Sequence, residues 1–123
     1  MLNGMENRIL VMSFDFSLEI IGLYKILLKH NEFVLSKQLL RSATSIGANV
    51  EEANAAQTKK DFISKMSIAS KEARETRYWL RLLDKSQMVQ SDYSTYLISI
   101  EAIIKVLTKI VKTSQQSITP SNI

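Results

Sequence analysis

Apolar side chains recur every three or four residues along most of this chain, a period that predicts α-helices rather than strands. The most regular example is a line of seven positions with alternating spacings of four and three: Phe62, Met66, Ala69, Ala73, Thr76, Leu80 and Leu83. Thr58 and Asp61 precede this line in the arrangement of a capping box, and Lys85-Ser86-Gln87 follow it. The pattern therefore predicts a helix that begins just after Thr58 and ends near Lys85.

A second predicted helix, over residues 36–57, has an apolar line beside a line of small or polar residues. The apolar line is Leu39, Ala43, Ile46, Val50 and Ala53, and the neighbouring line is Ser42, Ser45, Asn49, Glu52 and Ala56. Small side chains allow another helix to approach closely, so we expect Asn49 and Glu52 to form hydrogen bonds with that helix. Gly47 costs roughly 1 kcal/mol against Ala inside a helix, which indicates a packing reason for it.

The two outer helices are predicted over residues 13–30, with Ser13 as N-cap, and from Ser91 to about Thr113. Both have more apolar surface than one stripe. The first helix has further apolar residues beside the line Phe14, Leu18, Ile21, Lys25 and Leu28. The last helix has one line of Leu97, Ile100, Ile104, Leu107 and Val111 and a second line of Tyr96, Ile103 and Ile110. Helices that are apolar on more than one face are buried on more than one side, which favours self-association.

Four helices joined by short turns favour antiparallel neighbours, so the fold prediction is an all-α, antiparallel up-down-up-down four-helix bundle. At 123 residues the chain fits a single domain. We place the bundle at residues 13–113, with residues 1–12 as a flexible lead-in and the polar residues 114–123 as a disordered tail.

Composition excludes several classes of site. The chain has no cysteine and one histidine, so neither a thiolate metal site, a di-iron bundle nor Ser–His–Asp catalysis is expected. His30, at a helix end, is interpreted as a surface residue. Glu51 and Glu52 could serve acid–base chemistry, but carboxylates in this position more often anchor helix packing or face solvent. We expect a non-enzymatic, cytoplasmic protein with no cofactor and no metal. We also expect no membrane segment, because no apolar run approaches 18 residues.

The net charge of +4 is spread unevenly, because residues 1–57 hold five basic and six acidic side chains and residues 58–123 hold eleven and six. The basic side chains form two lines at helical spacing: Arg74, Arg77, Arg81 and Lys85 on one helix, and Lys105, Lys109 and Lys112 on the next. Such lines suit phosphate binding. The alternative is that they are solvated faces, partly neutralised by nearby Glu72, Glu75, Asp84 and Glu101.

Tyr78 and Trp79 lie to the sides of the apolar line of their helix. Such aromatic residues frequently anchor a protein partner. The alternative is that they pack between subunits or at the side of the core, and the sequence leaves both interpretations open.

Three segments together are similar to a known family: Ser13-Phe14-Asp15-Phe16, the run from Gln38-Leu39-Leu40-Arg41 to Ser45-Ile46-Gly47-Ala48-Asn49-Val50-Glu51-Glu52-Ala53, and residues 68–83 (IASKEARETRYWLRLL). They resemble a bacterial four-helix-bundle family named for open reading frames in intervening sequences of 23S ribosomal RNA genes. A related branch comprises accessory variability proteins of diversity-generating retroelements, which act with a reverse transcriptase and nucleic acid. This chain has Glu52-Ala53 where many members have Glu-Gly.

The resemblance implies a bundle that assembles into a ring, typically a pentamer, and a link to RNA, with no catalytic residues to carry over. We therefore expect a homo-oligomer that binds RNA or DNA through its two basic lines. The alternative is an oligomeric scaffold that binds a protein partner through Trp79 and exposed apolar surface.

Overall fold

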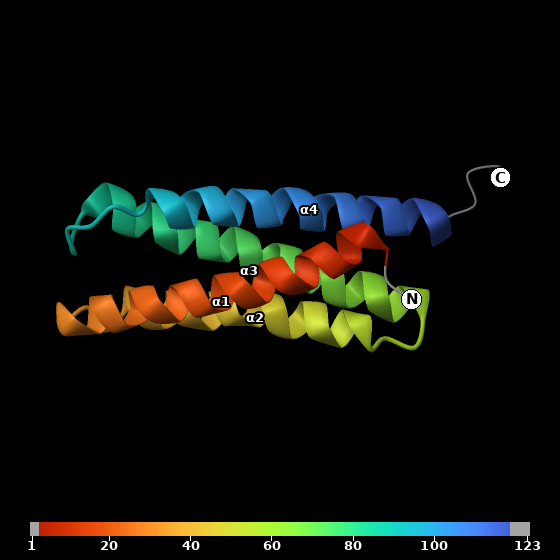
Figure 1. Cartoon of the computed structure of the whole chain (residues 1–123), viewed down its shortest axis with the longest axis horizontal. Helices are drawn as coiled ribbons and strands as arrows, with labels where there is room; N and C mark the ends of the chain where they lie inside the picture. Colours follow the sequence, from red (N-terminus) through yellow and green to blue (C-terminus); the bar gives the residue numbers. More distant parts are fainter. Residues whose placement is uncertain (1–2, 119–123) are drawn as a thin grey trace.

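The computed structural model describes residues 3–118, which form four helices: α1 (Gly4–Lys29), α2 (Leu35–Asn54), α3 (Lys59–Ser86) and α4 (Ser94–Ile118). Each helix runs antiparallel to the one before it, in an up-down-up-down bundle (Figure 1). Each packs against its neighbour in sequence and α4 also packs against α1, whereas the Cα atoms of the diagonal pairs of helices come no closer than 8 Å. Residues 3–118 contain no strand, and the predicted all-α four-helix bundle is confirmed.

The N-cap of α1 lies ten residues before the predicted one. Asn3, not Ser13, is the N-cap, and its Oδ1 accepts a hydrogen bond from the backbone N–H of Glu6 at 2.8 Å. Residues 4–12, predicted as a flexible lead-in, are helical. Ile9 is fully buried in the core, and its packing stabilises these turns. At the other end α4 continues to Ile118, so residues 114–118 of the predicted tail are helical. Residues 119–123 of that tail lie outside the described residues, as do residues 1–2.

The side of α1 that faces the core also differs from the prediction. Its buried apolar residues are Ile9, Phe16, Ile20, Leu23 and Leu27. Phe14 and Leu18 of the predicted line are 59% and 55% exposed. Two apolar lines adjoin on this helix, and the one that includes Lys25 faces outward. On α4 the second apolar line mostly belongs to the core, because Ile103 and Ile110 are each 1% exposed.

The apolar line of α2 is buried in full, as predicted, and the small residues beside it bring α2 close to its neighbours. Ser42 is completely buried, and its hydroxyl is hydrogen-bonded to that of Thr76 on α3 at 2.8 Å. Gly47 faces α1, where an added Cβ would lie 3.5 Å from the carbonyl oxygen of Ser13. That is ordinary contact, so the packing at Gly47 leaves room for a methyl group and little more.

Polar side chains fix the helix ends. The buried carboxylate of Glu32 accepts hydrogen bonds from the backbone N–H groups of Val34, Leu35 and Ser36, and so satisfies donors at the start of α2. Thr58 caps α3 as predicted, accepting from the N–H of Asp61 at 3.0 Å. α4 begins at Ser94, three residues after the predicted cap.

The side chain of Asp92 lies at the start of α4. Its Oδ1 accepts hydrogen bonds from the hydroxyl and the backbone N–H of Ser94, at 2.6 and 2.9 Å. These two bonds, the hydroxyl one first, hold the pKa of Asp92 below its ordinary value.

Candidate nucleic-acid interface

The two predicted basic lines meet along the junction of α3 and α4. Arg74 and Arg77 of α3 line one groove of about 770 Å³ together with Lys105, Lys109 and Lys112 of α4. The other lining residues are Glu101, Ile104, Thr108, Thr113 and Gln116. The lines meet because α3 and α4 are adjacent and each displays cations on the side of the junction. Five of the seven predicted nucleic-acid-binding residues thus share one groove.

The groove continues in both directions along α3. Toward the start of α3, Arg74 and Lys112 also line a hollow of about 260 Å³ that includes Ser67. Toward the end of α3, Arg77 and Arg81 line a hollow of about 300 Å³ with residues of α4. We call the three together the α3–α4 furrow. It follows α3 from Ser67 to Arg81, roughly 20 Å at the helical rise of about 1.5 Å per residue. Lys85 is exposed one turn further on and does not line it.

Most cations of the furrow have no acidic partner. The one acidic lining residue is Glu101, which pairs with Arg77 at 2.6 Å (Oε1 to Nη1). Arg74 donates from Nη2 to the hydroxyl of Thr108 at 3.1 Å. Within residues 3–118, the remaining cations of the two lines form no ion pair: Arg81, Lys85, Lys105, Lys109 and Lys112. The expected neutralisation is therefore limited to Arg77.

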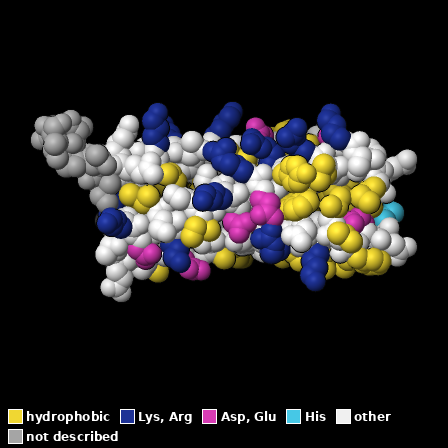
Figure 2. Space-filling view, turned by 180° about the vertical axis from the view of Figure 1, so that it is seen from behind, with side chains coloured by type: hydrophobic (Ala, Val, Ile, Leu, Met, Phe, Trp, Pro, Cys, Tyr) yellow, Lys and Arg dark blue, Asp and Glu magenta, His cyan; other side chains and the backbone are white. Residues whose placement is uncertain are grey.

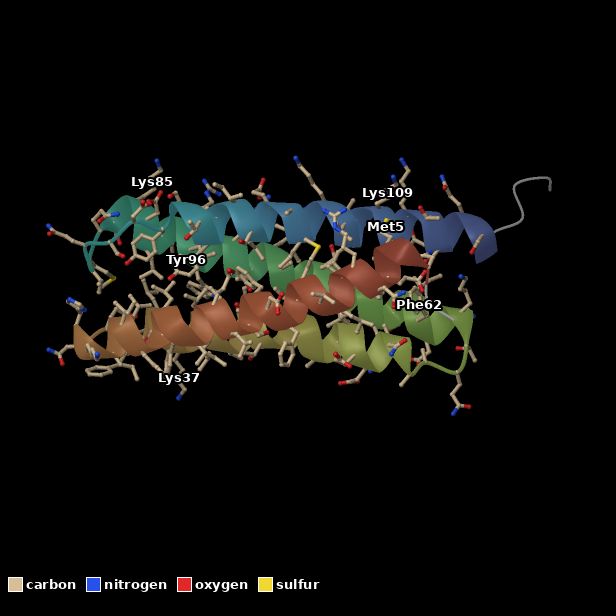
Figure 3. All side chains as sticks on the ribbon, viewed as in Figure 1. Met5, Lys37, Phe62, Lys85, Tyr96 and Lys109 are labelled. Atoms are coloured by element: carbon tan, nitrogen blue, oxygen red, sulfur yellow. The ribbon has the colours of Figure 1, made fainter. Side chains whose placement is uncertain are left out.

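The cations of the two basic lines lie on one side of the molecule. Figure 2 shows Lys and Arg side chains gathered along the edge formed by α3 and α4. Lys85 and Lys109, from the two helices, both point away from that edge, while Lys37 of α2 points away from the opposite one (Figure 3). The basic excess seen in the sequence is thus concentrated on one edge.

The other face of α3 pairs its charges with α2. Arg41 forms ion pairs with both Glu72 and Glu75 of α3. Sequence reasoning missed this role of Arg41, because the pairing joins two helices and no spacing within one helix signals it. Two of the acids expected to neutralise the basic line of α3 are thereby directed to α2 instead.

The predicted structural motif of Ser45, Asn49 and Glu52 lies on this α2–α3 face. Ser45 donates from Oγ to Glu72 at 3.0 Å, and Glu52 pairs with Lys65 of α3 at 3.1 Å. The expectation that Asn49 bonds to the neighbouring helix is wrong, because Asn49 donates to the carbonyl oxygen and the hydroxyl of Ser45 within α2, at 2.9 and 3.1 Å. Both Glu52 and Glu51 are exposed to solvent.

Tyr78 and Trp79 occupy different environments. Trp79 is partly buried and donates from Nε1 to Glu75 at 2.9 Å. Tyr78 is 52% exposed and makes a T-shaped contact with Trp79, with ring centroids 5.2 Å apart and an interplanar angle of 66°. Trp79 therefore belongs to the α2–α3 face, whereas Tyr78 is the aromatic side chain that solvent reaches.

Two further features of the described residues bear on candidate chemistry. His30 is exposed, and its Nδ1 lies 3.0 Å from the carbonyl oxygen of Ile26 at the end of α1. Residues 3–118 contain no cluster of three His, Asp or Glu side chains placed to hold a metal ion. In the same part of the chain, every helix is too short or too polar to cross a bilayer.

Comparisons with known proteins agree with the fold. The model of the family described as 23S rRNA-intervening sequence protein matches residues 5–109. A crystal structure of a protein of unknown function, from the S23 ribosomal protein family of Bacteroides thetaiotaomicron, superposes with a TM-score of 0.83. The sequences are 44% identical, and the match covers 88% of this chain and 98% of that one. A search of curated proteins found no match.

Proposed function

This chain belongs to the 23S rRNA-intervening sequence protein family, and on that premise we propose that it is a non-enzymatic protein that binds RNA or DNA by the phosphate backbone. The binding surface is the α3–α4 furrow. One observation carries the proposal: the furrow collects six cations from two helices, and the single carboxylate among its lining residues pairs with one of them. The cations are Arg74, Arg77, Arg81, Lys105, Lys109 and Lys112.

The dimensions of the furrow suit a polynucleotide strand. A length of roughly 20 Å corresponds to about six nucleotides at about 3.4 Å per nucleotide of one strand. Cations that neutralise phosphates release the counterions condensed on the strand, so the affinity arises without base-specific contacts and falls with salt. Arginine adds bidentate hydrogen bonding to phosphate oxygens.

We also propose that the protein is a homo-oligomer, and the resemblance described above implies a pentamer. The support in the structure is a line of exposed apolar residues on α1, Val11, Phe14 and Leu18, each more than half exposed. Ile98 of α4, 70% exposed, lies beside a groove of about 310 Å³ between α1 and α4. Burial of this surface between copies would repeat the furrow around the assembly. Light scattering at micromolar concentration is expected to give a multiple of 14.0 kDa, and a monomer mass would contradict the proposal.

The alternative function, a scaffold for a protein partner, draws on the same exposed apolar surface. It predicts an interaction with little salt dependence and with sensitivity to Trp79→Ala. The hydrogen bond from Trp79 to Glu75 commits that side chain to the α2–α3 face. The unpaired charges of the furrow favour the nucleic-acid function.

The test is a charge-reversal variant, Lys105→Glu, Lys109→Glu and Lys112→Glu, assayed with a labelled RNA hairpin at low salt. These three side chains are exposed and make no ion pair with residues 3–118, so the variant should keep its fold. We expect binding to weaken at least about 100-fold, because three attractive contacts become repulsive.

The matched control reverses the same number of charges elsewhere, at Arg8, Lys37 and Lys60, which are exposed and lie outside the furrow. It changes the net charge equally, so it separates a local surface from a general charge effect. The control is expected to keep most of the affinity. Equal losses of RNA affinity in both variants would show that net charge alone attracts the RNA, and would contradict binding in the furrow.

A further inference from the structure

Tyr78 lies among cations on the outer side of α3. Arg74 precedes it by four residues and Arg81 follows it by three, so each lies one turn away, about 5–6 Å between Cβ atoms. Lys71 and Lys85 lie two turns away in either direction. All four cations are exposed, and the Tyr78 side chain is itself 52% exposed. Figure 2 likewise shows hydrophobic side chains between Lys and Arg on this side.

The ring of Tyr78 is supported from one side. Its T-shaped contact with Trp79 covers at most one face of the ring, so at least one face stays free of Trp79. Trp79 is fixed by its hydrogen bond to Glu75, and Glu75 is in turn held by Arg41. The aromatic ring is therefore presented to solvent by a hydrogen-bonded support, and less side-chain freedom is lost when something stacks on it.

We propose that Tyr78 is a stacking platform for an unpaired nucleobase of the strand whose phosphates lie in the α3–α4 furrow. This inference rests on the proposed function and names its ligand class: single-stranded RNA or DNA, or the unpaired part of a folded RNA. An exposed aromatic ring beside cations that contact the backbone is the arrangement by which proteins hold single strands without sequence preference.

Arg74 and Arg81 connect the platform to the furrow. Both line the furrow, and both are also the neighbours of Tyr78 along α3. A strand whose phosphates contact these arginines has its bases within reach of the Tyr78 ring. Bases inside a duplex are stacked on each other and present no free face, so the platform discriminates against fully paired nucleic acid.

The first experiment compares a short oligouridine with an abasic strand of the same length and the same number of phosphates. Phosphate contacts are equal for the two strands, so any difference in affinity reports the bases. We expect the oligouridine to bind roughly 5- to 10-fold more tightly. The chain has a single tryptophan, Trp79, in contact with Tyr78. Its fluorescence should therefore be quenched by the oligouridine and much less by the abasic strand.

The second experiment removes the ring. Tyr78→Ala is expected to lose the 5- to 10-fold advantage for oligouridine and to leave binding of the abasic strand unchanged. Tyr78→Phe keeps a ring of the same shape and should retain the advantage. Phe33→Ala is the matched control, because Phe33 is 58% exposed in the connection between α1 and α2, and it should change neither affinity.

The outcomes separate this inference from the proposed function. Equal affinities for the two strands, or an unchanged advantage in Tyr78→Ala, would overturn the stacking role and leave backbone binding intact. That result would return Tyr78 to the protein-partner interpretation. Failure of both strands to bind at low salt would instead overturn the proposed function itself.

Discussion

The two faces of α3 use charge in opposite ways. On the face toward α2, Glu72 and Glu75 pair with Arg41, and Lys65 pairs with Glu52. On the face toward α4, a single ion pair, Arg77–Glu101, lies among cations that have no acidic partner within residues 3–118. The charges on one face of α3 are thus paired within the bundle, whereas most charges on the other face have no acidic partner within residues 3–118.

The difference matters because unpaired like charges have a cost. Like charges three or four residues apart on a helix are mutually destabilising by a few tenths of a kcal/mol per pair. Arg74, Arg77 and Arg81 on α3 follow that spacing, and Lys105 and Lys109 on α4 do too. The α2 face shows that acidic partners are available in this fold. Their scarcity along the furrow is what points to an external polyanion.

The largest predicted difference between the two faces is in their tolerance of volume. Ser42→Leu places a large side chain where Ser42 is fully buried against α3, and we expect a loss of about 2–3 kcal/mol in the free energy of unfolding. Ser70→Leu, on the side of α3 that lines the furrow, should stay within about 0.5 kcal/mol of the original protein. Denaturant unfolding measures both. Equal losses would mean that the furrow is packed as tightly as the α2 face.

The next largest difference concerns two hydroxyl groups. Thr76 is fully buried and hydrogen-bonded to Ser42, whereas Thr108 is exposed and accepts from Arg74. Thr76→Val should lower the free energy of unfolding by about 1–2 kcal/mol, because the buried hydroxyl of Ser42 loses a partner. Thr108→Val should change it by less than about 0.5 kcal/mol. A larger effect at Thr108 than at Thr76 would reverse the assignment of the two faces.

The smallest predicted effect compares two carboxylates. Glu101→Gln removes the one negative charge of the furrow and frees Arg77, so RNA affinity at low salt should rise about 2- to 3-fold, or roughly 0.5 kcal/mol. Glu72→Gln removes an equal charge from the α2 face and should leave RNA affinity nearly unchanged. Fluorescence anisotropy with a labelled RNA hairpin measures both. An equal rise in the two variants would indicate long-range attraction by net charge rather than contacts in the furrow.

The fold was largely predictable from the sequence, because each helix repeats apolar residues with a clear period. The predictions for α1 that were wrong, its core-facing side and its start, share one physical origin. On α1, two apolar lines adjoin, and Lys25 is the one local sign that the predicted line faces outward. The helix start at Gly4 depends on burial of Ile9 by other helices. Tertiary packing decided both, and periodicity alone neither ranks two adjoining apolar lines nor fixes where a helix begins.

The residues of the candidate site were predictable from the sequence, but their arrangement in space was not. Spacing identified the cations of α3 and α4, but only the antiparallel contact of the two helices shows that Arg74 and Lys112 line the same groove. The ion-pair partners of the acidic residues on α3 were not predictable from the sequence either. Glu75 was expected to neutralise the basic line of its own helix, and it pairs with Arg41 of α2 instead.

The measurement that tests the central claim most directly is the salt dependence of single-stranded RNA binding. It compares the original protein with a variant in which Lys105, Lys109 and Lys112 are all changed to Gln. If these lysines contact phosphates, the slope of log affinity against log salt should become shallower by about 2, at about 0.7 for each lost contact. An unchanged slope in the variant would contradict phosphate binding in the α3–α4 furrow.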